Sequence, residues 1–490
     1  MDTSSDKPAF WINGVAGSGK STIAQTTAQW CMDQDILAAS FFCARDGNRS
    51  NVQLIIPTIA YQLSSHSSEF ATALAAAVKA DTDIHMAYAS QQLRKLIVGP
   101  LKRLPATEPL ARFVVIIDAL DECTDDAAIS VILTALSAHV DDLAPLKFII
   151  TSRPEHHIVS GFKLKPLTQT TEQLVLTAVP EELTARDIGI YLREEFKTVC
   201  ESRGLDPAWP ADQDVEFLIE KSNGLFIYAA TVAKFVCGEN IEDPGEQLKI
   251  LLLQMGDSPF SESGPRLTQE SRFGQLDRLY LQVLGSAFPD MSALKKHFLG
   301  ALALAPDRVS LRTIAVMFGA NAHVLSTFLS RLQSIILPSA SHDEPLRLSH
   351  LSFADFIVDP ARCTNAQYFV DRHMQHAAMA KGCLNILTSQ LRFNICDVKH
   401  TTMLNEEIPD LGDRISQHIP PHLQYACRHW AYHMTNAKID QELHTLVTRF
   451  SERSLLDWLA ALSILGSMGI TVEALQSSRR ALEVSIIRDE

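Results

Sequence analysis

Positive charge is scarce in this chain of 490 residues. Lys and Arg number 43 against 57 Asp and Glu, which gives a formal net charge of −14. This balance argues against a broad surface for nucleic acid or other polyanions, because such surfaces depend on clustered Lys and Arg. It leaves room for a local basic site that holds one nucleotide.

Paired cysteines, a secretory leader and a membrane span are also missing from the sequence. Nine cysteines are scattered without a C-x-x-C pair, and Met1 leads directly into polar residues. Free thiols in a reducing compartment are the simplest interpretation. The longest late apolar run, 458–472, is shorter than the roughly 20 residues of a membrane-spanning helix. We therefore expect a cytoplasmic protein with no part in the membrane.

The composition is nevertheless sufficient for several globular cores. Hydrophobic residues make up 46% of the chain and charged residues 20%, which is typical of folded rather than disordered proteins. At roughly 100–200 residues per domain, the length predicts three or four domains.

A glycine-rich stretch near the N-terminus matches the phosphate-binding pattern G-x-x-x-x-G-K-[ST]. Its nine residues are Gly14, Val15, Ala16, Gly17, Ser18, Gly19, Lys20, Ser21 and Thr22. An apolar run at 10–12 precedes it and apolar residues at helical spacing follow it, so the order is strand, loop, helix. Such a loop aims its N–H groups at phosphate oxygens, and the helix dipole adds to the attraction. We expect Lys20 to reach the β- and γ-phosphates and Ser21 to bind Mg²⁺.

A second apolar run, 113–118, ends in an acidic turn. Such a run is typical of a parallel strand buried on both faces, and ligands of α/β sheets bind at the carboxyl ends of the strands. We expect Asp118 to hold Mg²⁺, directly or through water. Asp121 or Glu122 would orient and polarise the attacking water, and the spacing slightly favours Asp121 without deciding between them. The alternative is that these acidic residues only cap the next helix.

A third buried strand is predicted from Lys147 onward, and it ends in two hydroxyl residues followed by Arg153 and Pro154. Pro154 breaks the strand and fixes the turn. Because arginine suits bidentate phosphate contacts, we expect Arg153 to sense the γ-phosphate from this strand end.

The three motifs together resemble the NACHT NTPases, which belong to the signal-transducing (STAND) branch of P-loop ATPases. They read GVAGSGKST, VVIIDALDEC and FIITSRPEHHI. The similarity is especially close to fungal NLR-like proteins with nephrocystin-type NACHT domains, a group associated with innate immunity. Further stretches agree, among them SFFCARD, NGLFIYAATVAKFV, HLSFADFIVDPARC and LQYACRHWAYHM, so the resemblance covers nearly the whole chain.

The resemblance implies a nucleotide switch. Such a protein holds ADP at rest, forms a homo-oligomer when ATP replaces ADP, and hydrolyses ATP slowly with Mg²⁺ as cofactor. GTP stays open as an alternative to ATP. The implied partners are the nucleotide, further copies of the chain and signalling proteins that the sequence does not identify.

The later parts of the chain fit the lid of such a switch. Helical periodicity at 183–196, 215–221 and 225–236 predicts a small helical domain, and 256–266 reads as a linker rich in Ser, Gly and Pro. Helices followed by two short apolar segments around a polar turn then give the order of a winged helix. No basic recognition helix stands out, so we do not expect nucleic-acid binding.

Two segments of this lid are candidates for nucleotide contact. The resemblance implies that His350, directly after the predicted wing, donates to the β-phosphate of ADP and stabilises the closed state. The alternative is a helix-cap or core histidine. Relatives carry a proline-containing motif against the base where this chain has Leu225 and Phe226, and packing within the helical domain is the favoured interpretation there.

Histidines at helical spacing near the C-terminus, such as His373 and His376, lack accompanying Asp, Glu or Cys ligands, so we expect partly buried histidines rather than a metal site.

The predicted fold class is an α/β P-loop NTPase domain, with a parallel sheet and helices on both faces, followed by helical, winged-helix and all-α domains. The expected boundaries are 1–175 for the NACHT P-loop domain, 176–265 for the small helical domain, 266–364 for the winged-helix-like domain and 365–490 for the C-terminal helical domain.

Two functions stay open at this point. The first is a slow signalling ATPase, and the second is a nucleotide-dependent scaffold or truncated regulator with negligible hydrolysis. The second is suggested because the P-loop stands at the start of the sequence and no 20–50-residue repeat follows. We therefore expect a minimal form, a decoy or a truncated gene product without effector and repeat domains. A small-molecule kinase is disfavoured, because no acceptor-site motif is found.

Overall fold

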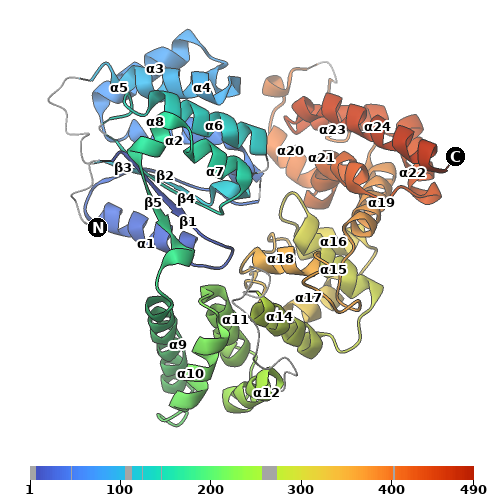
Figure 1. The fold of residues 1–490 in the computed structure, drawn as a ribbon. Coiled ribbons are helices and arrows are strands. Elements are labelled where there is room, and N and C mark those ends of the chain that lie inside the picture. The colour runs from blue at the N-terminus through green and yellow to red at the C-terminus, as the bar shows by residue number, and fades with distance from the viewer. Residues whose placement is uncertain are drawn as a thin grey trace. The chain divides into compact units, whose positions relative to one another are not determined.

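The computed structural model describes residues 7–45, 47–104, 113–123, 125–144, 146–256, 273–400 and 403–489. The chain divides into two compact units, and each is described here by itself (Figure 1). The first comprises Met1–Tyr191 with Gly224–Ala229, and the second Leu192–Asn223 with Ala230–Glu490. The predicted linker lies, from residue 257 onward, outside the described residues.

A parallel sheet of five strands forms the centre of the first unit. The strands are β1 (Ala9–Asn13), β2 (Leu37–Phe42), β3 (Val114–Asp118), β4 (Lys147–Ser152) and β5 (Thr171–Val175), in the order β2-β3-β4-β1-β5. Asn13 at the end of β1 pairs with Ser152 at the end of β4. The segments that follow β1, β3 and β4 therefore leave the sheet at one edge, where α/β proteins bind their ligands.

Helices cover both faces of this sheet (Figure 1). They are α1 (Lys20–Asp33), α2 (Ile55–Leu63), α3 (Ser68–Ala80), α4 (Ala89–Gln92), α5 (Gly99–Leu101), α6 (Asp126–His139), α7 (His156–Phe162) and α8 (Lys165–Thr170). A π-helical segment, Leu93–Val98, connects α4 to α5. Helix α1 packs on one face, where Ala24 and Ala28 meet Ile116 of β3. Helices α2, α6 and α7 contribute to the larger core on the opposite face, which confirms the predicted α/β class.

The central strands are apolar because both of their faces are buried. Val115 and Ile116 of β3 are each 0% exposed, as expected for a parallel strand between two helical layers. On the α7 side, the rings of Trp11 and Phe162 stack with their centroids 4.2 Å apart. The Trp11 indole N–H also donates to Ser152 Oγ at 2.9 Å. These contacts fix the ends of β1 and β4, from which the loops of the candidate site emerge.

The second unit is almost entirely helical in its described residues. Its helices include α10 (Asp212–Lys221), α11 (Phe226–Cys237), α12 (Pro244–Gly256), α14 (Gly274–Ala287), α15 (Ala293–Leu304), α16 (Leu311–Met317), α17 (Ala322–Arg331), α18 (Ser352–Ile357), α19 (Arg372–Gln390), α20 (Leu411–His418), α21 (Pro421–Asn436), α22 (Gln441–Arg453), α23 (Leu455–Ile464) and α24 (Thr471–Asp489). Both α9 (Glu181–Arg203) and α11 cross the boundary between the units. The predicted succession of helices after the sheet domain is thus confirmed.

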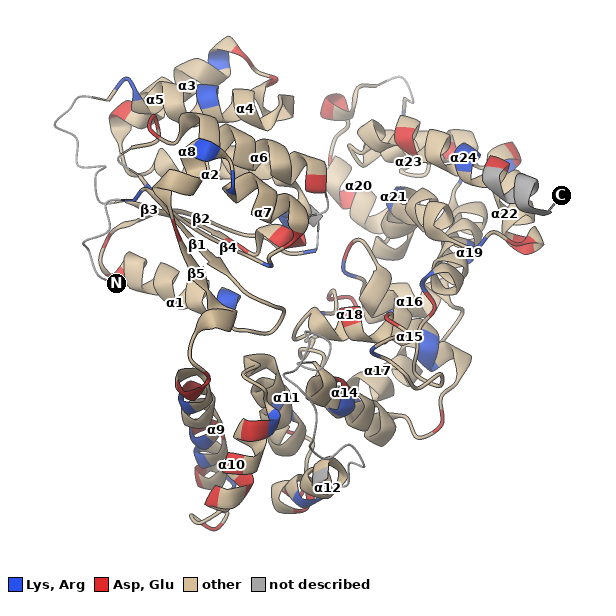
Figure 2. Ribbon diagram, in the orientation of Figure 1, with Lys and Arg blue, Asp and Glu red and all other residues tan. Residues whose placement is uncertain are grey.

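The two apolar segments predicted to form a wing, 335–338 and 346–348, are joined by one antiparallel bridge, between Ile336 and Leu348. A second bridge joins Ser310, at the start of α16, to Pro345. Helix α17 before them contains Arg331 as its one Lys or Arg, and Figure 2 shows basic and acidic residues interspersed along α9 and α10. The name winged helix stays a prediction for this part of the chain.

Two of the C-terminal histidines considered in the sequence, His376 and His433, lie in a core, whereas His373, which was expected to be partly buried, is exposed. His376 and His433 are buried, and their Nδ1 atoms lie 2.9 Å apart. The Nε2 atom of His433 lies 2.8 Å from the hydroxyl of Tyr425. One contact thus joins α19 to α21, and the other lies within α21.

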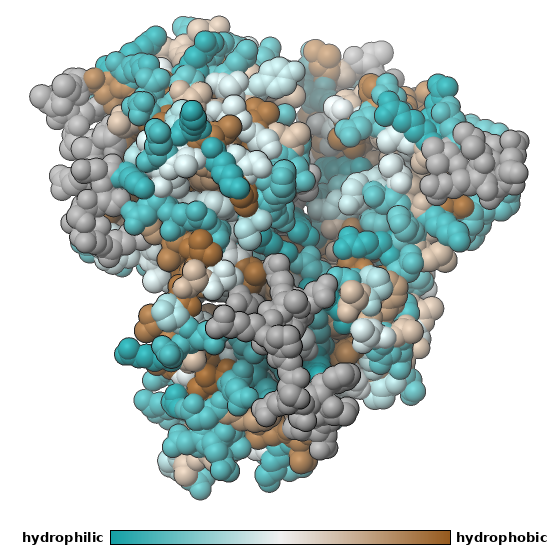
Figure 3. All heavy atoms as spheres, in the orientation of Figure 1, coloured by the Kyte–Doolittle hydropathy of each residue, from teal (hydrophilic) through white to brown (hydrophobic). Residues whose placement is uncertain are grey.

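Helices of membrane-spanning length and hydropathy are not found among the described residues. In the view of Figure 3, apolar side chains are scattered among polar ones.

Candidate functional site

The loop between β1 and α1 contains the nine residues predicted to bind phosphate, with the last three in the first turn of the helix. Gly17 and Gly19 have φ angles of 77° and 93°, a left-handed backbone that favours glycine. A Cβ on Gly14 would lie 2.7 Å from Ser18 Oγ. The glycines of the motif are therefore required by the shape of the loop itself.

No side chain caps the N-terminus of α1 with a hydrogen bond. Gly19 at the cap position makes no side-chain hydrogen bond, and the first turn of α1 contains no acidic residue. The unsatisfied N–H groups of a helix start and the positive end of its dipole attract phosphate.

The side chain of Lys20 is buried and folds back over the loop. Its Nζ donates to the carbonyl oxygens of Gly14 and Val15, each at 2.9 Å. Burial lowers the pKa of Lys20, and the carboxylate of Asp121 acts in the opposite direction. Phosphate oxygens would offer this ammonium group charged acceptors in place of two neutral carbonyls, and such hydrogen bonds are stronger.

Asp118 stands at the end of β3 with 3% of its surface exposed. The hydroxyl of Thr151 donates to Asp118 Oδ1 at 2.6 Å, and Asp118 also hydrogen-bonds the side chain of Ser21. Burial raises the pKa of Asp118, while these two hydrogen bonds lower it. The predicted magnesium ligands, Ser21 and Asp118, are thus neighbours that present oxygen atoms, the ligands that Mg²⁺ prefers.

A strained turn follows Asp118. Ala119 has a φ of 54°, which is uncommon for a residue other than glycine and concentrates at functional sites. Its N–H donates to Thr151 Oγ1 at 2.9 Å. Thr151 therefore holds both the carboxylate at the strand end and the turn after it. Thr151 was not predicted as a site residue, although the two hydroxyl residues at the end of β4 were the signal that could have identified it.

Asp121 and Arg153 are paired in a mostly buried contact. The backbone N–H of Arg153 donates to Asp121 Oδ1 at 2.9 Å, and Nε of Arg153 lies 3.1 Å from Oδ2. The side chain of Asp121 is 3% exposed and that of Arg153 is 20% exposed. Both carboxylate oxygens of Asp121 thus have a partner from the strand end beside it.

Glu122 has a different environment from Asp121. Burial, followed by the nearby carboxylate of Asp121, raises the pKa of Glu122 to about 7, while Arg45 and Arg153 oppose the rise. A carboxyl group with this pKa exchanges its proton near neutral pH, which is the property required of a general base.

A segment from later in the chain lies against the phosphate-binding loop. The N–H of Ile227 donates to the carbonyl oxygen of Gly17 at 3.2 Å. The Phe226 ring lies 3.6 Å from the position that a Cβ on Gly19 would take. Leu225 beside them is buried. These contacts are with the loop, and whether Leu225 or Phe226 meets a base stays a prediction.

His350 belongs to the second unit, just before α18. Its Nδ1 accepts the backbone N–H of Ser352 at 3.0 Å and lies 2.7 Å from Ser352 Oγ. The predicted helix-cap alternative and the predicted phosphate contact both remain compatible with this local geometry.

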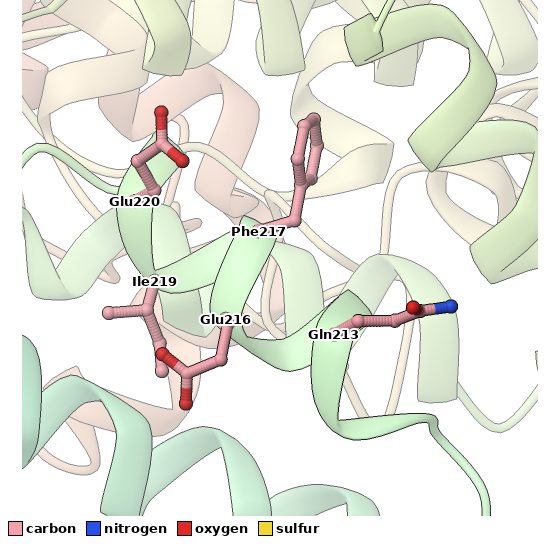
Figure 4. Close-up of a pocket in the computed structure, with 5 residues that line it drawn as sticks. All are labelled: Gln213, Glu216, Phe217, Ile219 and Glu220. Atoms are coloured by element: carbon pink, nitrogen blue, oxygen red, sulfur yellow. The ribbon is translucent and has the colours of Figure 1, made fainter.

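Two other features do not resemble a site. A shallow depression on α10 is lined by Gln213, Glu216, Phe217, Ile219 and Glu220, whose side chains point in different directions (Figure 4). Ligand atoms of Asp126, Glu155 and His157 lie within 4.8 Å of one another. Asp126 and Glu155 stand at the starts of α6 and α7, where carboxylates stabilise helices without any metal.

The residues at the edge of the sheet fit a nucleotide with Mg²⁺. The loop offers a tight backbone, an open helix start and a buried lysine, and the neighbouring strand end adds a hydroxyl and a carboxylate. Of the predicted residues, the structure brings together Lys20, Ser21, Asp118, Asp121, Glu122 and Arg153.

Comparison with known families agrees with this arrangement. Residues 1–153 match the family model described as Nephrocystin 3, N-terminal. The N-terminal third of this chain is therefore similar to that family. The predicted resemblance to nephrocystin-type NACHT domains is thereby confirmed for these residues.

The other comparisons add little to this assignment. No curated protein matches the chain. A Signal Transduction ATPase with Numerous Domains (STAND) protein with a tetratricopeptide repeat sensor, from Pyrococcus horikoshii, is 13% identical over 98% of this chain and 62% of that chain, with a TM-score of 0.40. A chain from the structure of Drosophila ORC bound to DNA is 13% identical over 71% of this chain and 88% of that one, with a TM-score of 0.33. Similarity this low supports no inference about function, and the present chain spans only 62% of the STAND protein.

Proposed function

We propose that this protein is a NACHT-type nucleotide switch that binds ATP or ADP with Mg²⁺ and hydrolyses ATP slowly. The observation that supports it best is the grouping of Lys20, Asp118 and Arg153 around the loop that follows β1. In this proposal Lys20 binds the β- and γ-phosphates, and Ser21 and Asp118 hold the metal ion. GTP is an alternative substrate that the same contacts would accept.

Glu122 is proposed as the group that activates the attacking water. Asp121, which the motif spacing slightly favours, has both oxygens bound by Arg153. Glu122 has a pKa of about 7 and so can accept a proton at neutral pH. Asp121 then serves to hold Arg153.

Arg153 is proposed as the sensor of the γ-phosphate. A γ-phosphate within reach would compete with Asp121 for its guanidinium group, since arginine binds phosphate in the same bidentate manner as carboxylate. Exchange between these two partners would couple the presence of ATP to the position of the loop after β4.

The remaining parts of the switch rest on the family resemblance. We retain the proposed domains 1–175, 176–265, 266–364 and 365–490, with His350 of the third domain donating to the β-phosphate of ADP. Loss of that contact on exchange for ATP would release the closed state and allow a homo-oligomer to form. The signalling partners stay unidentified.

Calorimetric titration of MgATP tests the phosphate site directly. Lys20→Arg is expected to abolish binding, because a guanidinium group is too large and too planar for the position that Nζ occupies over the loop. Lys163→Arg, an exposed position in the same unit, is the matched control and should bind as the wild type does. Unchanged affinity in Lys20→Arg would defeat the assignment of the site.

A scaffold that holds nucleotide without turnover is the second candidate. The observation in its favour is that Lys20 and Asp121 already have hydrogen-bond partners within the protein, so the resting site is satisfied without a reacting phosphate. Size-exclusion chromatography with ADP and with a non-hydrolysable ATP analogue separates the two proposals. A switch changes its elution volume between the two nucleotides, whereas a scaffold elutes at the same volume with both.

A further inference from the structure

The last residue of β1, Asn13, has a buried amide group whose donor is not used within the protein. Asn13 is 3% exposed, and its Nδ2 atom has no hydrogen-bond partner in the part of the chain that the structure describes. Most buried polar side-chain atoms in proteins are hydrogen-bonded, and an unpaired buried donor destabilises the folded state. A ligand that brings an acceptor to this amide would remove that cost.

Asn13 stands at the edge of the sheet from which the phosphate-binding loop emerges. The next residue is Gly14, the first of the loop. The backbone of Asn13 pairs with Ser152 of β4 on one side and with Val175 of β5 on the other. Because two neighbouring strands hold the backbone, the amide group is carried by a rigid element, as accurate ligand binding requires.

The side chain of Asn13 lies on the face of the sheet that α7 covers. Side chains alternate along a strand, and Trp11, two residues before Asn13, stacks on Phe162 of α7. The hydroxyl of Ser152 accepts the indole N–H of Trp11 at 2.9 Å, and it forms no hydrogen bond with the Nδ2 atom of Asn13. Among the described residues the amide donor is thus left without an acceptor, and a ligand would have to supply one.

The ammonium group of Lys20 indicates which part of a nucleotide would approach Asn13. The Nζ atom of Lys20 donates to the carbonyl oxygen of Gly14 at 2.9 Å, and Gly14 directly follows Asn13. A phosphate group that binds Lys20 therefore comes to the beginning of the loop, whereas the start of α1 lies at the end of the loop. The terminal phosphate of ATP is the group expected to bring an acceptor to Asn13.

We propose that Asn13 is a further nucleotide-binding residue, whose amide N–H donates to the terminal phosphate of ATP and so favours ATP over ADP. This inference rests on the proposed function, in which Lys20 binds the same phosphate. ADP lacks the acceptor, so the ADP-bound protein keeps the unpaired donor that the ATP-bound protein satisfies. The amide thus binds the two nucleotides differently, as a group that favours one of two states must do.

Asn13→Leu tests the proposal, because leucine has the branched shape of asparagine without its donor. In calorimetric titration the affinity for MgATP should fall about tenfold, the effect of one hydrogen bond to a charged acceptor, while the affinity for MgADP stays unchanged. The thermal transition that MgATP shifts in the wild type should occur, without nucleotide, at the same temperature or higher, because the substitution removes an unpaired buried group.

The matched control is Thr171→Val, which removes an unpaired polar group elsewhere in the same sheet. Thr171 begins β5 and pairs with Ala9, at the opposite end of β1 from Asn13. Its Oγ1 atom is also buried without a partner among the described residues, and valine is close to threonine in shape. This substitution should leave the affinities for both nucleotides unchanged.

A second variant, Asn13→Asp, keeps the shape of the side chain and replaces the donor with a carboxylate. Its affinity for MgATP should fall further than that of Asn13→Leu, because like charges repel. Equal losses of MgATP and MgADP affinity in Asn13→Leu would indicate a structural role and overturn the inference. Unchanged affinities, or a lower transition temperature without nucleotide, would overturn it as well, since the amide would then serve the folded state alone.

Lys20→Arg distinguishes failure of this inference from failure of the proposed function. If Lys20→Arg abolishes binding while Asn13→Leu binds both nucleotides as the wild type does, the phosphate site stands and only the role of Asn13 is wrong. If Lys20→Arg binds MgATP normally, the proposed function is wrong, and the role of Asn13 is wrong with it.

Discussion

The environment of Glu122 leads to a prediction in which stability and activity change in opposite directions. The pKa of Glu122 is about 7 in the folded protein, against an ordinary value of 4.5. Between these pH values the folded protein keeps a proton that the unfolded chain has released. The free energy of unfolding should therefore fall as the pH rises from 4.5 to 7. The difference between the two pKa values corresponds to at most about 3 kcal/mol.

The substitution Glu122→Gln removes this charge while keeping the size of the side chain. At pH 8 it should raise the free energy of unfolding of the N-terminal unit by up to about 3 kcal/mol, and at pH 4.5 it should have little effect. ATP hydrolysis should fall by about a hundredfold or more, because the proposed proton acceptor is lost.

Scanning calorimetry at the two pH values measures the stability effect. The relevant transition is the one whose midpoint rises when MgATP is added, since ligand binding stabilises the unit that contains the site. Glu182→Gln, at an exposed position near the start of α9, is the control for loss of one carboxylate. The reasoning is refuted if Glu122→Gln shifts the midpoint equally at pH 4.5 and pH 8.

Three further predictions concern other contacts. Thr151→Val removes the hydrogen bond to Asp118 and should raise the Mg²⁺ concentration needed for ATP binding about tenfold, and an unchanged requirement would contradict the role of Thr151. Gly161→Ala would place a Cβ 2.5 Å from Leu133 Cδ1 and should cost about 1–3 kcal/mol in denaturant unfolding, a loss that adding Leu133→Ala should partly relieve. Burial lowers the pKa of His376 to about 4, so stability should fall as the pH drops from 6.5 towards 4, by up to about 3 kcal/mol. A flat urea midpoint between pH 7 and pH 5 would exclude that effect.

Most of the central sheet could be predicted from the sequence, because a strand that is buried on both faces has apolar residues at nearly every position. Strands β3 and β4 are of this kind, and each ends at the residues the runs predict. Strand β5 was not predicted. Its residues, Thr171–Val175, include Thr, Glu and Gln, and it lies at the edge of the sheet with one neighbour, so no apolar run marks it.

The residues of the candidate site were easier to predict than the hydrogen bonds and ion pairs between them. Asp118, Asp121 and Arg153 were recognised from their motifs, but the bond between Asp121 and Arg153 joins residues 32 positions apart in the chain. That contact depends on β3 and β4 being neighbours in the sheet. A sequence motif does not reveal which strands are neighbours. Thr151 was missed for the same reason.

The helical spacing of apolar residues does not distinguish an α-helix from a π-helical segment. In the stretch from α4 to α5 the structure has helical segments, with a π-helical segment at Leu93–Val98 between them. A wider turn changes which side chains face the core, although the spacing of apolar residues still looks α-helical. Of these residues, Leu93, Leu96 and Ile97 are all buried.

The nucleotide content of the purified protein tests the central claim most directly. Protein freed of unbound nucleotide by gel filtration is denatured in acid, and the released nucleotides are separated by ion-exchange chromatography and quantified. We predict close to one equivalent of ADP or ATP per chain for the wild type and none for Lys20→Arg. A folded wild-type protein that releases no nucleotide and takes up no MgADP or MgATP in calorimetry would contradict the account.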